Sequence, residues 1–345
     1  MPTPLDVLFA DADNLPPDIL SDPARQELAA YSAYLDATVP AKRSVNRNLL
    51  IATWNICKFG SLTKQWSVPA VSHLSPKRDY RCLWAIADIL SRFDIVAVQE
   101  VTGDLRALRY TMEILGPRWN FVMTDVSRGD AGNKERMAFL FDTSRVSLSG
   151  LACELVVPDE AEDYGFDPGA FKRQFARNPY AVSFRSGPTT IILVTAHIDF
   201  GDETIERLPE IRGIAKWLGD WAAQENRWHH NLMLLGDFNL DRSDNALYEA
   251  FVSTGLEVPY VLSSFPRTIY ADPGQPESGS YHDQIAWFSE GDRALLGMEP
   301  GDGGSLEIFG RLLADLGLSK RSFATRISDH HPLWMEFRVS DPLVG

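Results

Sequence analysis

The chain has 345 residues, of which 45% are apolar and 23% are charged, as is ordinary for a globular protein with a sizeable core. No run approaches the roughly 18 consecutive apolar residues of a membrane-spanning helix, so the sequence predicts no such helix. The formal net charge of −14 argues against a protein that neutralises nucleic-acid phosphates over its whole surface, although gathered carboxylates can also bind a cation.

The first 47 residues differ from the rest and are interpreted as an appended arm. Residues 1–40 hold seven acidic residues and one basic residue. Asp22 precedes a proline, which resembles a helix N-cap followed by proline at the first helical position and predicts a helix over 23–37. We expect the arm, residues 1–47, to lie along the surface of a domain covering 48–345, with a protein partner for the arm as the alternative.

From residue 49 onward, short apolar runs alternate with amphipathic stretches. The runs predict strands over residues 49–54, 95–99, 137–141, 190–195, 232–235 and 333–337. Apolar side chains at helical spacing predict helices around residues 83–90, 105–115 and 204–226. Strands mixed with helices in this way indicate a layered α/β sandwich.

Cysteine usage and the first ten residues bear on the compartment. Cys57, Cys82 and Cys153 form no Cys-x-x-Cys pair, so we expect free thiols rather than disulfides or a thiolate zinc site. Residues 1–10 lack a basic stretch followed by a long apolar core, so we expect no secretory signal. Together these observations predict a cytoplasmic protein.

Polar side chains adjoin most of the predicted strands. A single one could be a turn former or a helix cap, but six such clusters are harder to explain that way, because strand ends hold side chains on a rigid backbone with open access. The clusters supply five oxygen ligands and two imidazoles: Asn55, Glu100, Asp237, Asn239, Asp329, His197 and His330. Oxygen ligands without cysteine suit Mg²⁺ or Mn²⁺. A hard cation together with histidines is typical of sites that hydrolyse phosphate esters.

Several motifs in this order form a recognisable set. They are Gln99-Glu100, Lys134-Glu-Arg136, Arg177-Asn-Pro179, Gly236-Asp-Phe-Asn239 and Ser328-Asp-His330. The set resembles the endonuclease/exonuclease/phosphatase superfamily from about residue 49 to 338, and the second and third motifs favour its deoxyribonuclease I branch. The resemblance implies one catalytic domain, a four-layered sandwich of two mainly antiparallel β-sheets flanked by helices, with the site along one edge.

The resemblance also implies a role for each site residue. Glu100, supported by Asn55 and Asp329, is expected to hold Mg²⁺, with Mn²⁺ as a possible substitute. Asp237 and Asn239 are expected to orient the attacking water and the phosphate.

Two histidines are each expected to pair with a carboxylate that raises the pKa of the imidazole, so that it can donate to a phosphate oxygen or to the departing oxygen. The expected pairs are His197 with Glu135 and His330 with Asp283. Arg177 is expected to contact the phosphate together with Asn239 and the two histidines.

Two positions depart from the branch. Thr102 stands where deoxyribonuclease I carries an arginine that enters the minor groove, and Asn133 stands where it has a DNA-contacting aromatic residue. A preference for duplex DNA therefore stays open. Contact with nucleic acid is predicted for a strip of basic residues: Lys77, Arg78, Lys134, Lys172, Arg173 and Arg177.

The leading functional hypothesis is an Mg²⁺-dependent nuclease, acting on DNA in the first place, that hydrolyses phosphodiesters by in-line attack of water and leaves 5′-phosphate ends. The alternative is a phosphatase or phosphodiesterase acting on a phosphoinositide, a sphingomyelin-like lipid or a small phosphorylated molecule, which the net acidity favours. A third possibility is a binding or scaffold protein that keeps the fold but has lost activity. It would require that one of the expected catalytic residues be missing, and the sequence contains all of them.

Overall fold

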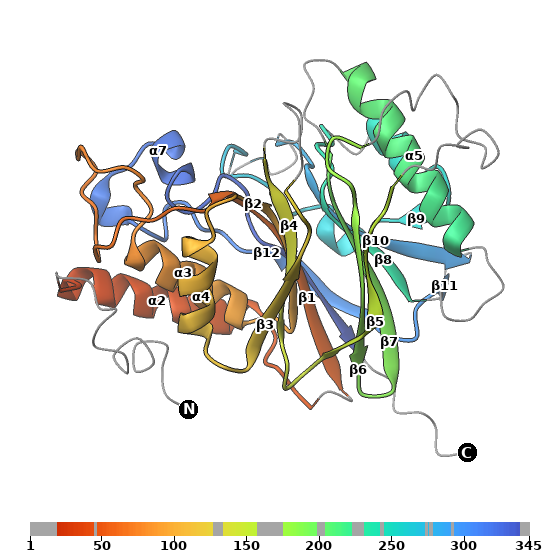
Figure 1. Ribbon diagram of the computed structural model, residues 1–345, viewed down its shortest axis with the longest axis horizontal. Coiled ribbons are helices and arrows are strands. Elements are labelled where there is room, and N and C mark those ends of the chain that lie inside the picture. The colour runs from red at the N-terminus through yellow and green to blue at the C-terminus, as the bar shows by residue number, and fades with distance from the viewer. Residues whose placement is uncertain are drawn as a thin grey trace.

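The computed structural model describes residues 19–44, 47–126, 134–156, 175–198, 204–222, 231–241, 245–272, 275, 279–290 and 293–338. They form four layers, in which two β-sheets pack face to face and helices cover both outer faces (Figure 1). This confirms the predicted sandwich. Among the described helices, none combines the length and the apolar character needed to cross a bilayer.

The first sheet has the strand order β12-β13-β1-β2-β4-β3. Its strands are β1 (Asn48–Phe59), β2 (Ile95–Val101), β3 (Trp119–Met123), β4 (Arg136–Asp142), β12 (Glu299–Ser305) and β13 (Leu333–Arg338). In this described sheet β1 and β2 run parallel, and the other neighbours run antiparallel.

The second sheet has the order β11-β10-β8-β7-β6-β5, and a short β9 also pairs with β10. Its strands are β5 (Ser147–Glu154), β6 (Tyr180–Ser186), β7 (Thr189–His197), β8 (Leu232–Asp237), β9 (Leu256–Glu257), β10 (Asp283–Glu290) and β11 (Arg293–Ala294). Here β7 and β8 form the parallel pair. Each sheet is thus antiparallel apart from one central parallel pair, as the resemblance implied.

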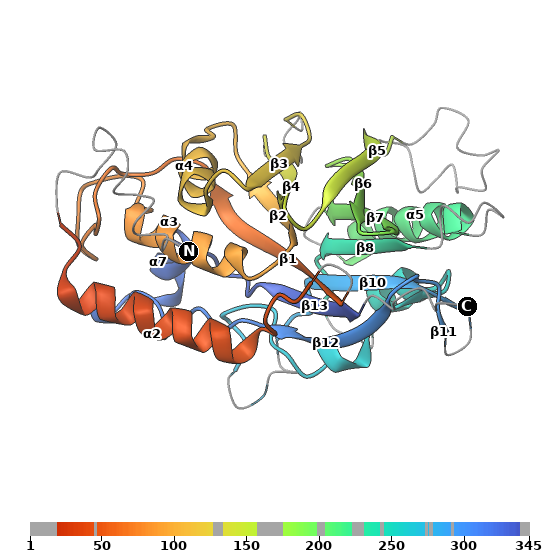
Figure 2. The same ribbon diagram turned by 90° about the horizontal axis from the view of Figure 1, so that it is seen from below.

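The strands are apolar on both faces because each face meets a different layer. In β1, Leu49 and Ile51 enter the core between the sheets, whereas Leu50 and Ala52 enter the core under the helices of the first sheet. Successive side chains of a strand point to opposite faces, so a continuous apolar run is what a strand covered on both sides requires. Figure 2 shows the two sheets between their helices from below.

The helices are divided between the two outer faces (Figure 1). The first sheet is covered by α2 (Asp22–Thr38), α3 (Tyr80–Ser91) and α4 (Arg106–Leu115), and the second by α5 (Thr204–Ala222) and α6 (Ala246–Val252). Within the described ranges there are three further helical turns: η4 (Tyr260–Leu262), η6 (Ala314–Leu316) and α7 (Lys320–Ala324).

Helix α2 begins one residue earlier than predicted. Its N-cap is Ser21, whose hydroxyl accepts a hydrogen bond from the Ala24 backbone N–H, so the interpretation of Asp22 as the cap is wrong. The buried face of α2 joins the core cluster that contains α3, and Glu27 forms a salt bridge of 2.7 Å with Arg81 of α3. The division into an arm and a domain, and a partner for the arm, stay predictions.

Candidate active site

A cavity of about 470 Å³ lies where the central parallel strands of both sheets end. All predicted site residues line it except Glu135 and Asp283, which lie behind the two histidines. The lining residues among them are Asn55, Glu100, Arg177, His197, Asp237, Asn239, Asp329 and His330. Parallel strands bring their carboxyl ends to the same edge of a sheet, which explains why residues so far apart in sequence converge.

Irregular backbone aims Glu100 into the cavity. The register of β2 shifts between Val98 and Val101, and Glu100 has a φ of 60°. Its Oε1 accepts a hydrogen bond of 3.0 Å from Asn55 Nδ2, and its Oε2 accepts one of 2.9 Å from the backbone N–H of Lys58. A bulge that turns a strand residue out of the ladder is common beside active sites.

A glycine allows the two central strands of the second sheet to approach closely. Gly236 pairs with Ala196 and has a φ of 148°, and a Cβ atom there would lie 2.1 Å from the Ala196 carbonyl oxygen. The next pair in this register is His197 with Asp237. The glycine therefore sets the distance between these two site residues.

Gln99 joins the two sheets beneath the cavity. Its buried Nε2 donates to Thr53 Oγ1 at 3.1 Å and to Thr195 Oγ1 at 2.9 Å, on β1 and β7 respectively. The sequence places Gln99 directly before Glu100, but its role across the sheets is visible only in three dimensions.

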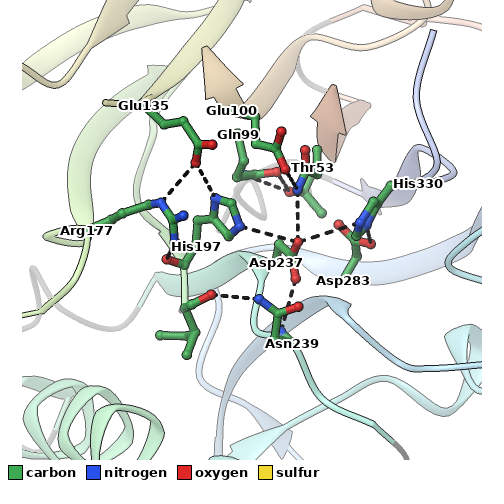
Figure 3. A network of polar contacts seen from close by, with 12 residues as sticks. Thr53, Gln99, Glu100, Glu135, Arg177, His197, Asp237, Asn239, Asp283 and His330 are labelled. Carbon is green, nitrogen blue, oxygen red and sulfur yellow. Dashed lines mark hydrogen bonds and ion pairs between the residues drawn. The ribbon is translucent and has the colours of Figure 1, made fainter. Parts of the chain in front are cut away.

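Asp283 holds His330 on one side of the site (Figure 3). Its Oδ2 lies 2.6 Å from His330 Nδ1, so the predicted hydrogen bond is present. Burial alone would lower the pKa of His330, but Asp283 and then Asp237 raise it well above its usual range. Burial raises the pKa of Asp283 to about 6, against the opposing effect of His330. At neutral pH the pair is therefore an imidazolium and a carboxylate.

The His197 side differs from the prediction. Glu135 Oε2 lies 3.5 Å from His197 Nδ1 and accepts a hydrogen bond of 3.0 Å from Arg177 Nε instead. Burial lowers the pKa of His197 to about 4, so the expected raised pKa is wrong for this histidine. Burial, and next the charge of Glu100, raise the pKa of Glu135 to about 7. The physical reason is the burial of the His197 ring, which disfavours the charged imidazolium, while Glu135 is turned to Arg177.

Asp237 lies between the two imidazoles, 3.7 Å from His197 Nε2 and 3.8 Å from His330 Nε2 (Figure 3). Its Oδ2 also accepts a hydrogen bond of 2.9 Å from Asn55 Nδ2, and its Oδ1 accepts one from the backbone N–H of Asn239. Burial would raise the pKa of Asp237, but His330 and then His197 lower it below its usual range. The site thus holds an ionised carboxylate between one charged and one neutral imidazole.

The side chains that were predicted to bind a cation present a suitable set of oxygen atoms. Asn55 turns its Nδ2 to two carboxylates, and its buried Oδ1 has no hydrogen-bond partner among the described residues. An unpaired buried amide oxygen beside the carboxylates of Glu100 and Asp329 is a suitable donor set for a hard cation. No cluster of three or more His, Cys, Asp or Glu side chains that could hold a metal occurs in the part of the chain that the structure describes.

The sequence pattern of the Endonuclease/Exonuclease/phosphatase family matches residues 52–330. The chain belongs to this family. A protein named deoxyribonuclease from Thioalkalivibrio sp. (strain K90mix) is 31% identical over 199 residues, which make up 56% of this chain. These residues are 46% of that relative, so the chain matches a little under half of its length.

Solved structures of low sequence identity share the fold. Mannosyl-6-phosphatase of Bacteroides thetaiotaomicron superposes with a TM-score of 0.54 at 17% identity, covering 84% of this chain and 99% of that one. D. rerio TDP2 complexed with single strand DNA product superposes with a TM-score of 0.52 at 15% identity, covering 84% and 98%. At these identities the likeness shows the fold alone.

Within this endonuclease/exonuclease/phosphatase domain, Arg78 does not face nucleic acid. It is 2% exposed, and its guanidinium donates to the backbone carbonyls of Cys57, Lys58, Arg326 and Ile327. Its prediction as a member of the basic strip is therefore wrong, because these carbonyls satisfy its donors inside the protein. The guanidinium of Arg326 donates in turn to the carbonyls of Val68, Pro69 and Lys77.

The other members of the strip lie in different surroundings. Lys134 is exposed, Lys77 is half-buried, and Arg177 lines the cavity. Lys172 and Arg173 lie outside the described residues, as does Asn133.

Six cavity-lining residues were not among the predicted site residues, and three of them carry polar groups or rings that face the site: Thr268, Tyr270 and His282. The ring of His282 lies 5.7 Å from that of His330, and its place directly before Asp283 is a signal that could have found it. Tyr270 lies in a connecting segment, and no sequence signal distinguishes it from other loop tyrosines.

Proposed function

We propose that this protein is an Mg²⁺-dependent nuclease that hydrolyses phosphodiester bonds, with DNA as the first substrate to test. The observation that carries the proposal is the placement of His197 and His330 on either side of Asp237, with a carboxylate behind each imidazole. Family membership and the 31% identical relative named deoxyribonuclease support the same reaction class.

Asn55, Glu100 and Asp329 would hold the cation. When bound, Mg²⁺ would supply positive charge that offsets the negative charge developing on the phosphate and on the leaving oxygen. The donor set matches this ion, since it consists of oxygens only.

The charge states of the site residues give the His197 side and the His330 side of the site different roles. Ionised Asp237, with Asn239 hydrogen-bonded to it, can orient the attacking water molecule. His330 carries a proton at neutral pH and can donate it to a phosphate oxygen or to the departing oxygen. Neutral His197 and the guanidinium of Arg177 provide further donors at the cavity wall.

The test is a substrate panel with a matched pair of variants. Plasmid DNA, single-stranded DNA, RNA, a phosphoinositide and mannose 6-phosphate are incubated with Mg²⁺, Mn²⁺ or EDTA. We expect cleavage of DNA with either metal, none in EDTA, and loss of activity in Glu100→Gln at unchanged melting temperature. Glu113→Gln, which changes an exposed residue of α4, should behave as the wild type.

Two outcomes would count against the proposal. Near-normal turnover of Glu100→Gln in metal-replete buffer would remove Glu100 from the metal site. Turnover of the phosphoinositide or of mannose 6-phosphate without cleavage of any nucleic acid would favour the alternative, a phosphatase or phosphodiesterase, which the net charge of −14 favours on electrostatic grounds.

A further inference from the structure

Tyr270 presents an exposed aromatic ring at the mouth of the catalytic cavity. It lines the cavity together with Asp329 and His330, yet 54% of its surface is exposed. Its ring offers a large flat apolar face with a polar hydroxyl at one end. Beside a site that handles phosphate, such a ring is available to a flat group attached to that phosphate.

The backbone fixes this ring relative to the proposed phosphate position. The N–H of Ile269 donates to the carbonyl of Asp329 at 2.8 Å, and Thr268 pairs with His330 in an antiparallel bridge. Ile269 is buried in the hydrophobic core, so core packing also fixes the position of this segment. Tyr270 is thus anchored to the loop that carries His330, and its position is set in advance of binding.

A cation stands beside the ring. Nζ of Lys320, the first residue of α7, lies 5.9 Å from the centroid of Tyr270 and 5.9 Å from that of Phe309. Among the residues that the structure describes, Lys320 forms no salt bridge, so its charge is available to a phosphate. An aromatic face beside a positively charged group is typical of sites that bind single-stranded nucleic acid.

Thr102, in contrast, offers no charge to a duplex. It is half-buried, and its hydroxyl would lie 1.9 Å from a Cβ atom at Gly60, so it fills the space between two loops. In an intact duplex the faces of the bases are covered by their neighbours, whereas an unpaired nucleotide exposes a face that can stack on a tyrosine.

We propose that Tyr270 and Lys320 form a subsite that stacks the base of an unpaired nucleotide and binds its phosphate, next to the bond that is hydrolysed. The subsite gives the enzyme a preference for single-stranded or unpaired nucleic acid over intact duplex. This inference rests on the proposed nuclease function.

The test compares variants of the full chain on one DNA sequence, offered as a single strand, as a duplex, and as a single strand with an abasic nucleotide beside the cleaved bond. Tyr270→Ala should raise KM for the intact single strand roughly tenfold, as expected for the loss of one base–aromatic stack, with kcat unchanged. Tyr270→Phe keeps the ring and should keep the wild-type KM. Tyr260→Ala is the matched control, since Tyr260 is 90% exposed and lies in a different cavity.

The abasic strand separates stacking from a general structural effect. On it, wild type and Tyr270→Ala should have the same KM, because no base is present to stack. An unchanged KM of Tyr270→Ala on the intact strand, or an equal loss on both strands, would overturn the subsite while leaving the nuclease proposal in place. Failure of the wild-type enzyme to cleave any nucleic acid would overturn the nuclease proposal, and the subsite with it.

Discussion

Replacing Glu135 by glutamine removes a buried carboxylate whose ionisation opposes folding. The residue is 6% exposed, and burial, followed by the charge of Glu100, raises its pKa to about 7 from an ordinary value of 4.5. The folded protein therefore keeps this proton to a higher pH than the unfolded chain does. As a consequence, the contribution of Glu135 to stability falls as the pH rises from 4.5 to 7. The amide of glutamine is neutral at every pH and can still accept the hydrogen bond of Arg177 Nε.

The size of the effect follows from the pKa shift. One pKa unit corresponds to about 1.4 kcal/mol, so ionised Glu135 costs about 3 kcal/mol of stability at pH 8 and about 2 kcal/mol at pH 6. Relative to wild type, Glu135→Gln should therefore gain about 3 kcal/mol in free energy of unfolding between pH 4 and pH 8, with most of the gain reached by pH 7.

Urea unfolding of wild type and Glu135→Gln at a series of pH values measures this difference. EDTA is present throughout, because a cation on Glu100 would offset one of the charges that raise the pKa of Glu135. Glu113→Gln, at an exposed position of α4, serves as the control. A stability difference between wild type and Glu135→Gln that stays constant from pH 4 to pH 8 would refute the reasoning.

Two further substitutions test the geometry of the site. Asp283→Asn should lower kcat by roughly 10²- to 10⁴-fold without changing Mg²⁺ binding, because an amide no longer favours the proton on His330; an unchanged kcat in steady-state kinetics would contradict this. Gly236→Ala should lower the free energy of unfolding by about 2–4 kcal/mol, since its Cβ would lie 2.1 Å from the Ala196 carbonyl oxygen. Gly255→Ala, also at positive φ but with nothing within 4 Å, should lose clearly less stability in the same urea titration.

The layers of the fold could be predicted from the sequence because burial on both faces leaves a strong local pattern. The runs 49–52 and 232–235 are apolar without interruption, which is what strands between two covered faces require. The end of β1 could not be predicted in the same way. Asn55 is polar because its side chain enters the cavity, although its backbone continues the strand to Phe59.

The candidate site residues could be found because rigid strand ends place polar side chains beside one another. Their partners are less predictable, since the distances between separate segments are set by how the sheets pack. Glu135 was expected to bind His197 and hydrogen-bonds Arg177 instead. Arg78 has the sequence context of a surface residue, and only its four carbonyl partners show that it is internal.

The pairing of β13 with β1 makes assembly of the site depend on a segment that lies far from β1 in the sequence. Strand β1 lies between β2 and β13, and Ser328, just before β13, donates a hydrogen bond of 2.6 Å to the carbonyl of Asn55. Without that segment, β1 would have an open edge, and Asn55 would have neither Asp329 nor His330 beside it. A chain cut before Ser328 would therefore lack an assembled site even with its first helices and strands in place.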